Sequence, residues 1–230
     1  MKGILLTLML ATLIPTFSSA DDVFTYTPID HASFVLQVGD TTVYVDPVGS
    51  KEKYTRFPAP DLILITHTHG DHLAPKLLSE IKQDNTQVIG PATAIKKLGY
   101  GTAINNGDTT TLAGLKIEAV PAYNITKDRL NFHPKGRDNG YVISKDAKRL
   151  YISGDTEDIP EMRALKDIDI AFICMNLPYT MTIEQAASAV NAFKPKIVIP
   201  YHYRGKGGMS DIDAFEKMVP GTVVEKLMWY

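Results

Sequence analysis

The sequence predicts an α+β sandwich in which two mixed β-sheets pack face to face, with helices on the outside. Two observations lead to this fold class. The chain has 230 residues, of which 44% are hydrophobic and 22% charged, so it is able to bury a sizeable core as one domain. Its two halves also read alike, each as hairpin strands followed by alternating strands and helices. No sequence repeat between the halves is strong enough to prove a duplication.

The first twenty residues are expected to be a secretory signal peptide. Lys2 precedes an apolar region over residues 4–14, and small residues follow up to Ala20, where a signal peptidase would cleave. A short membrane anchor or a buried first helix is the alternative, but the apolar region is too short to span a bilayer comfortably. We therefore expect one mature domain over residues 21–230, located in the periplasm or secreted, with no stable membrane insertion after cleavage.

The first half of that domain is expected to begin as an antiparallel meander. Strands are predicted at residues 24–27, 33–38 and 41–45, with His31 between the first two. Residues 47–60 contain three prolines and several charges and read as a surface loop that borders a site. The remaining predicted elements are a strand at 62–66, a helix at 75–83, a strand at 87–89 and a helix at 92–98 that Gly99 ends.

The second half begins with strands at residues 109–112 and 115–120. A long polar loop follows over residues 123–138 and contains His133, and loops of this length are often functional. The helix at 182–193 has Thr182 as its N-cap. The other predicted elements are strands at 141–143, 150–152, 168–174, 196–200 and 223–228, and helices at 160–165 and 211–218.

The charge and the single cysteine argue against nucleic-acid binding and against thiol catalysis. The formal net charge is −2 and no basic run occurs, so nucleic acid is not an expected partner. The single cysteine, Cys174, lies in an apolar strand-like run, and we expect a buried inert thiol rather than a catalytic one. The expected partner is a small-molecule substrate, and the sequence makes no prediction of the oligomeric state.

The segment from Thr66 to His72 carries the strongest chemical signal. If residues 62–66 form a buried strand, His67 and His69 leave its end pointing the same way and can bind one ion together. Asp71 and His72 follow on the turn into the next element, and their different direction suits a second ion. A polar loop that is histidine-rich by chance is disfavoured, because three of the six histidines occur here beside a carboxylate.

Two further acidic or histidine residues follow predicted strands, namely Asp155 in Ser-Gly-Asp-Thr and His202 in Pro-Tyr-His. In open α/β sheets the carboxyl ends of strands are where sites form. A mixed set of imidazoles and carboxylates favours zinc, manganese or iron over calcium and magnesium, which prefer all-oxygen ligands. The expected cofactor is zinc, as two ions, with manganese or iron as alternatives.

The chain resembles the metallo-β-lactamase-fold hydrolases, and within them the compact lactonase-like branch. The H-x-H-x-D-H motif is matched by His67, His69, Asp71 and His72, and the later segments around Asp155 and His202 follow in the family's order. The likeness covers essentially the whole mature chain, and it implies a four-layer αββα sandwich. Members of this branch open with a histidine near the start, as His31 does here.

The resemblance also implies roles for these residues. His67 and His69 would hold the first metal, Asp71, His72 and His202 the second, and Asp155 would bridge them. The family usually has a third histidine for the first metal just after the strand at 115–120, where this chain has Asn124. Asn124 is one candidate for that ligand and His133 from the loop is the other, and we favour His133 because imidazole is the better ligand for a borderline metal.

The implied activity is a metal-dependent hydrolysis in which a metal-activated hydroxide cleaves an ester, lactone or phosphodiester bond of a small molecule. Asp71 is the expected catalytic residue, because it can orient the water or accept its proton. His31 and Arg204 are candidate pocket or substrate contacts. A non-catalytic exported metal-binding protein, with Asn124 as a sign of site decay, and a true β-lactamase are the alternative functions.

Overall fold

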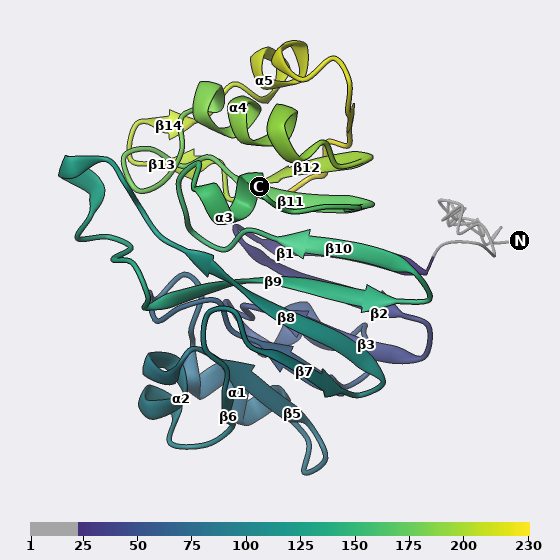
Figure 1. Cartoon of the computed structure of the whole chain (residues 1–230). Helices are drawn as coiled ribbons and strands as arrows, with labels where there is room; N and C mark the ends of the chain where they lie inside the picture. Colours follow the sequence, from purple (N-terminus) through teal and green to yellow (C-terminus); the bar gives the residue numbers. More distant parts are fainter. Residues whose placement is uncertain (1–22) are drawn as a thin grey trace, which may run out of the picture.

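The computed structural model describes residues 23–230, and the predicted signal peptide lies outside that range. Two β-sheets form the centre of the described chain (Figure 1). The first sheet contains β1 (Phe24–Asp30), β2 (Ser33–Val38), β3 (Thr41–Val45), β4 (Leu62–Leu64), β5 (Gln87–Gly90) and β6 (Thr102–Ala103), which lie side by side in chain order.

The second sheet is built from the second half of the chain. Its strands are β7 (Thr109–Leu112), β8 (Leu115–Ala122), β9 (Asp138–Lys145), β10 (Lys148–Ile152), β11 (Ile170–Cys174), β12 (Ile197–Tyr201) and β15 (Val223–Val224). They are ordered β15-β12-β11-β10-β9-β8-β7, and a separate small hairpin is formed by β13 (Arg204–Gly205) and β14 (Gly208–Met209). Each half of the chain therefore makes one sheet, as the sequence predicts.

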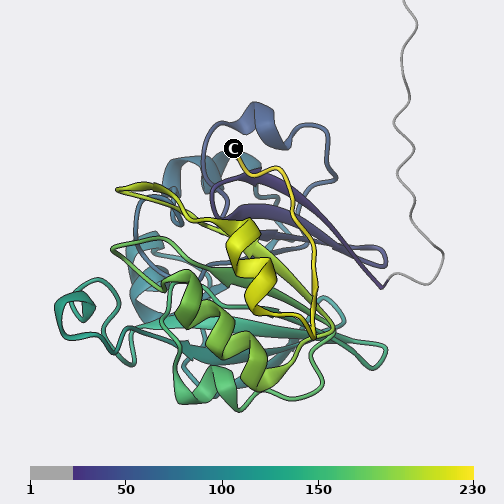
Figure 2. The ribbon, with the colours of Figure 1, turned by 90° about the horizontal axis from the view of Figure 1, so that it is seen from above.

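Helices cover the outer faces of both sheets, which gives the predicted four-layer sandwich. The 3₁₀ turn η1 (Lys51–Tyr54) and helices α1 (Pro75–Ile81) and α2 (Ala92–Leu98) lie with the first sheet. Helices α3 (Pro160–Arg163), α4 (Ile183–Phe193) and α5 (Ile212–Met218) lie together over the second sheet, as both views show (Figures 1 and 2). A second 3₁₀ turn, η2 (Lys127–Arg129), lies in the loop between β8 and β9.

Alternation along the strands assigns each side chain to a layer. In β4, Leu62 and Leu64 are buried between the two sheets, whereas Ile63 packs under the helices with Leu78 of α1. On α4, Val190 and its neighbours face the second sheet, and Thr182 caps the helix in a capping box with Gln185. Each such buried aliphatic side chain contributes about 1.5–3 kcal/mol, so this core fixes the strands that carry the site.

Most predicted elements are confirmed, several with ends shifted by one to three residues. The strand predicted over 62–66 ends at Leu64, and the strand predicted over 223–228 contains only Val223 and Val224. Residues 47–60 are not wholly a surface loop, because they contain η1 and bury Tyr54. No helix within residues 23–230 is long and apolar enough to cross a membrane.

Parallel pairing brings several strand ends to one edge of the sandwich. β3 pairs in parallel with β4, and β11 pairs in parallel with both β10 and β12. The residues that directly follow these strands therefore lie at the same edge. They include Asp46 after β3, the segment from Thr66 after β4, and Asp155 and His202 after β10 and β12.

Candidate metal centre

The six histidines of the chain all belong to clusters at this edge. One cluster contains His67, His69 and His133, a second contains His31, Asp71 and His202, and a third contains His67, His72 and Asp155. In each, one ligand atom per residue lies within 4.8 Å of the others. The predicted residues Asp71 and Asp155 are thus brought together with all the predicted histidines.

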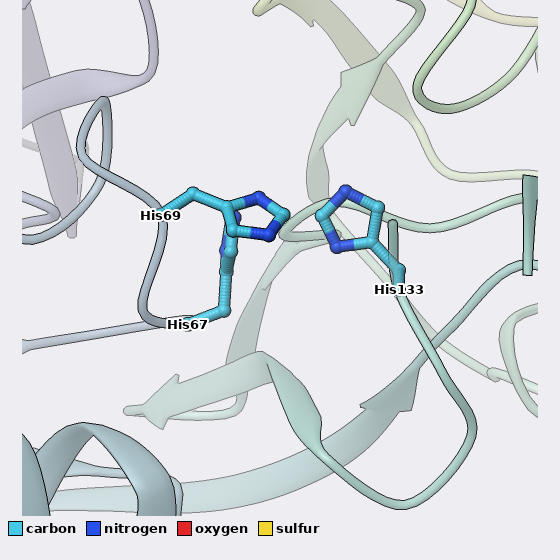
Figure 3. A group of neighbouring side chains, drawn as sticks. All are labelled: His67, His69 and His133. Atoms are coloured by element: carbon cyan, nitrogen blue, oxygen red, sulfur yellow. The ribbon is translucent and has the colours of Figure 1, made fainter. Parts of the chain in front are cut away.

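His67, His69 and His133 form a tripod of imidazole rings. Their ring centroids lie 4.6–4.9 Å apart and the planes are steeply inclined to one another. Figure 3 shows the rings turned toward one another, with the first two residues on the loop after β4 and His133 on a separate loop. The Nε2 atoms of His67 and His133 are buried and make no hydrogen bond within residues 23–230. Three imidazoles arranged in this way provide one face of a tetrahedral site.

The loop between β8 and β9 places His133, and Asn124 helps to hold that loop. The backbone N–H of Asn124 donates to the His133 carbonyl at 2.8 Å, and its side-chain amide donates to the carbonyls of Arg129 and Tyr179. The Nδ1 of His133 lies 3.1 Å from the buried Asp138 carboxylate. Of the two residues that the sequence offered as a third partner of His67 and His69, the structure places His133 in the cluster.

Asp138 is itself held in place by Arg137, a residue that the sequence patterns did not indicate. The Arg137 guanidinium donates to both Asp138 oxygens, at 2.7 and 2.8 Å, and to the Phe132 carbonyl. A two-point contact of this kind restricts the carboxylate to one orientation. It therefore also fixes the ring of His133, whose Nδ1 faces that carboxylate.

Asp155 stands between the two sides of the centre. Its Oδ2 lies 3.3 Å from Nε2 of His133, whereas its Oδ1 lies 3.5 Å from Nε2 of His72 and 3.4 Å from Nε2 of His202. Glycine is required at position 154, just before Asp155. Its φ is +60°, and a Cβ there would come within 2.7 Å of the Asn139 carbonyl oxygen. The two carboxylate oxygens thus face different clusters.

Asp71, His72 and His202 lie on the other side of Asp155. The Nε2 atoms of His72 and His202 are 2.9 Å apart, and the Asp71 Oδ2 lies 3.9 and 3.5 Å from them. A turn in which the backbone N–H groups of His72 and Leu73 donate to the His69 carbonyl gives the motif its change of direction. The Asp71 side chain is 46% exposed whereas the two imidazoles are buried, so this side of the centre opens to solvent.

Asp46 is a site residue that the sequence patterns did not predict. It is fully buried, its Oδ2 lies 2.7 Å from Nδ1 of His72, and its two oxygens accept hydrogen bonds from the backbone N–H and hydroxyl of Thr66. The Thr66 hydroxyl in turn lies 3.0 Å from Nδ1 of His67. The sequence feature that points to Asp46 is its position as an acidic residue at the end of β3, which pairs with the strand before the histidine motif. Asp46 thus orients the imidazole of His72 directly and that of His67 through Thr66.

The electrostatics of the centre suit a cation. Burial lowers the pKa of His67 well below its ordinary value, and His72 lowers it further. Burial alone would raise the pKa of Asp155, but His202 and His72 outweigh it and hold that pKa well below its usual range. Burial also opposes protonation of His72, yet Asp155 and Asp46 raise its pKa to about 9. The carboxylates therefore stay ionised and attract positive charge.

The residues also fit a metal by their unpartnered atoms. Within residues 23–230, the buried side-chain atoms without a hydrogen bond include Nε2 of His67, Nε2 of His133 and Oδ1 of Asp155. Buried polar atoms are normally satisfied, so a group of them facing one place indicates a ligand. Their nitrogen and oxygen donors match Zn²⁺, Mn²⁺ or Fe²⁺.

His31 and Arg204 lie at the solvent side of the centre. The His31 Nε2 is 3.4 Å from Asp71 Oδ2, and its Nδ1 is 3.0 Å from the hydroxyl of Tyr230. The Arg204 guanidinium stacks over the Tyr230 ring at 4.4 Å from its centroid, and the Arg204 backbone N–H donates to the same hydroxyl. No local sequence pattern connects Tyr230 with the motif, because nearly 160 residues separate them.

Comparison with known proteins agrees with this geometry. A family model described as the β-lactamase superfamily domain matches residues 25–202. A UPF0173 metal-dependent hydrolase of Thermococcus onnurineus is 32% identical over 223 residues, covering 86% of this chain and 97% of that protein.

Two solved structures agree in sequence and fold. A protein of Parabacteroides distasonis assigned as a metal-dependent hydrolase is 48% identical with a TM-score of 0.83, covering 89% of this chain and 94% of that one. Igni18, a metallo hydrolase of Ignicoccus hospitalis, is 26% identical with a TM-score of 0.74 and the same coverage. The resemblance read from the motifs is confirmed: the chain belongs to the β-lactamase superfamily and, within it, to the UPF0173 metal-dependent hydrolases.

Proposed function

We propose that the chain is a dinuclear metal hydrolase that cleaves a carboxylic ester, lactone or phosphodiester of a small molecule. The observation that carries this proposal is the position of Asp155, whose Oδ2 faces His133 while its Oδ1 faces His72 and His202. A carboxylate with one oxygen toward each of two ligand clusters is suited to bridge two ions. The first ion would be held by His67, His69 and His133, and the second by Asp71, His72 and His202.

Zinc is the metal we propose, with manganese or iron as alternatives, because most of the donors are imidazoles. Divalent ions bound there would supply the Lewis acidity that makes water a nucleophile near neutral pH and polarises the bond to be cleaved. The alternative of a non-catalytic binder rested on Asn124 as a sign of decay. The contacts of Asn124 with the loop instead support an intact arrangement in which His133 takes that place.

Three carboxylates of the chain have further roles in the proposed reaction. Asp71 is the exposed carboxylate of the centre, so it can orient the attacking water and accept its proton. Burial would raise the pKa of Asp71, but the His202 and His31 side chains more than compensate and hold it below the usual range, so that the proton acceptor is ionised. Asp46 and Asp138 keep the imidazoles in place while this occurs.

Exposed apolar side chains on segments that carry or adjoin site residues support a substrate with an apolar group. Ile125 and Leu130 are exposed on the loop that carries His133, Leu177 is exposed on the loop after β11, and Met209 is exposed on the hairpin that follows His202. Both views place the loop over residues 123–137 and the β13–β14 hairpin at the same end of the molecule (Figures 1 and 2). These exposed apolar side chains favour an ester or lactone with an apolar substituent.

A substrate panel tests the proposal. The metal-loaded protein is expected to hydrolyse 4-nitrophenyl esters, with kcat/KM rising about two- to fourfold per added acyl methylene over short chains, as expected if each CH₂ is buried on binding. Lactones, bis(4-nitrophenyl) phosphate and a chromogenic β-lactam complete the panel. Two bound ions without turnover of any compound would favour the non-catalytic binder, and turnover of the β-lactam alone would favour a β-lactamase.

We also propose that the protein is exported, supported by the charge, apolar region and small residues of positions 1–20. Protein expressed from the full-length sequence in a bacterial host is expected to reach the periplasm with Asp21 as its first residue. Amino-terminal sequencing of the periplasmic and cytoplasmic fractions tests this. Full-length protein confined to the cytoplasm would contradict it.

A further inference from the structure

We propose that His31 is an additional ligand of the second ion, and that the Tyr230 hydroxyl holds its imidazole in the ligating orientation. The inference rests on the proposed two-ion function and adds to it a ligand from the turn between β1 and β2, outside the motif segments. Three independent observations support it.

The first is the spacing of donor atoms. Two atoms bound to one ion at about 2.0–2.2 Å, at angles of about 90–110°, lie about 3–3.5 Å apart. Nε2 of His31 lies 3.4 Å from Oδ2 of Asp71, which itself lies 3.5 Å from Nε2 of His202. These are the same separations that join His202 and His72 to Asp155. The His31 donor therefore has the spacing of the ligands already assigned to the second ion.

The second observation is the direction of the imidazole. Nδ1 of His31 is engaged by the Tyr230 hydroxyl at 3.0 Å, so Nε2 is the nitrogen that faces Asp71 and His202. A ligating histidine usually donates its other N–H to an oxygen acceptor, which fixes both the tautomer and the ring plane. Tyr230 is held in turn by the Arg204 backbone N–H and by the stacked Arg204 guanidinium.

The third observation is the backbone. His31 has φ +56° and His202 has φ +46°, a left-handed conformation that is costly for side chains other than glycine. The His202 N–H donates to the His31 carbonyl at 3.3 Å, and the two ring centroids are 3.9 Å apart. Because β1 and β12 belong to different sheets, this contact joins the sheets directly at the site. Strain at two contacting histidines is explained if both must face one ion.

The test measures metal binding as well as turnover. Wild type, His31→Ala, Tyr230→Phe and Tyr203→Phe are stripped of metal and titrated with Zn²⁺ in a competing chelator and with Co²⁺ by visible absorption. Tyr203→Phe is the matched control, because its ring lies against Tyr230 and it removes a hydroxyl from the same cluster. Circular dichroism and thermal unfolding verify that each variant folds.

We expect His31→Ala to bind the first ion as the wild type does, to bind the second about 10–100-fold more weakly, and to change the Co²⁺ absorption of the second ion only. Tyr230→Phe should weaken the second ion in the same direction by a smaller factor, and Tyr203→Phe should bind both ions normally. If His31→Ala does not fold, Tyr230→Phe decides the question through the same readouts.

Two outcomes are distinguishable failures. Wild-type affinity and Co²⁺ absorption for both ions in His31→Ala and Tyr230→Phe, with a loss confined to kcat, would overturn the ligand assignment and place His31 against the substrate. A wild-type protein that binds one ion, or two ions without turnover, would instead contradict the proposed function on which the inference rests.

Discussion

Replacement of Asp71 by asparagine or alanine is expected to reduce hydrolysis by about 10²–10⁴-fold, the usual contribution of a positioned proton acceptor. The side chain is the exposed carboxylate of the centre and a proposed ligand of the second ion, so its loss removes a proton acceptor and a metal donor without opening the core. The thermal unfolding of either variant should therefore stay close to that of the wild type. Steady-state kinetics on the best ester, with metal content measured on the same samples, gives the comparison. His72→Ala should abolish hydrolysis as well, because it removes a donor to the second ion.

Asp213→Asn is the matched control for Asp71→Asn, because it changes an exposed acid on α5, outside the metal-binding clusters. It should leave kcat unchanged. Full activity of Asp71→Asn or Asp71→Ala in the presence of both ions would show that Asp71 is not the catalytic proton acceptor.

Asp46→Asn is expected to have the second large effect, on metal affinity and on stability together. The buried carboxylate accepts from the Thr66 N–H and hydroxyl and faces Nδ1 of His72, and an amide nitrogen in its place would meet a donor instead of an acceptor. Metal affinity should fall about 10–100-fold, as when other such supporting carboxylates are removed. The free energy of unfolding should fall by about 1–3 kcal/mol, the cost of a buried donor left without a partner.

Asp61→Asn separates a site effect from a general one. Asp61 also accepts a backbone hydrogen bond in the first sheet, from Thr42 at 2.8 Å, whereas Asp46 in addition faces Nδ1 of the cluster residue His72 at 2.7 Å. Asp61→Asn should lower stability modestly and leave metal affinity unchanged. Equal losses of metal affinity in the Asp46 and Asp61 variants would contradict a specific role for Asp46.

The sequence was sufficient to predict those features that depend only on residues close together in the chain. The short uninterrupted apolar run from Leu62 to Ile65 predicted a buried strand, and the Thr182 cap and the Gly99 stop located two helix ends. The close spacing of His67, His69, Asp71 and His72 predicted a metal site, because neighbouring positions at a strand end must share one region of space.

What could not be read from the sequence depends on contacts between distant segments. Asp46 and His72 are 26 residues apart and meet because β3 pairs with β4. His31 and Tyr230 are separated by almost the whole chain, and only the packing of the two sheets joins them. The preference for His133 over Asn124 rested on ligand chemistry alone for the same reason, since the position of His133 depends on how Arg137 and Asp138 shape the loop between β8 and β9.

If two ions shared through Asp155 produce hydrolysis, titration of the metal-free protein with Zn²⁺ should show that activity requires both. Turnover of the best ester and bound metal per chain are followed in the same titration. The structure leads us to expect binding of two ions per chain and activity that reaches its maximum only as the second ion binds. An Asp155→Asn variant should bind both ions more weakly and lose activity. Full activity at one ion per chain, or in Asp155→Asn, would exclude hydrolysis by two ions that share Asp155.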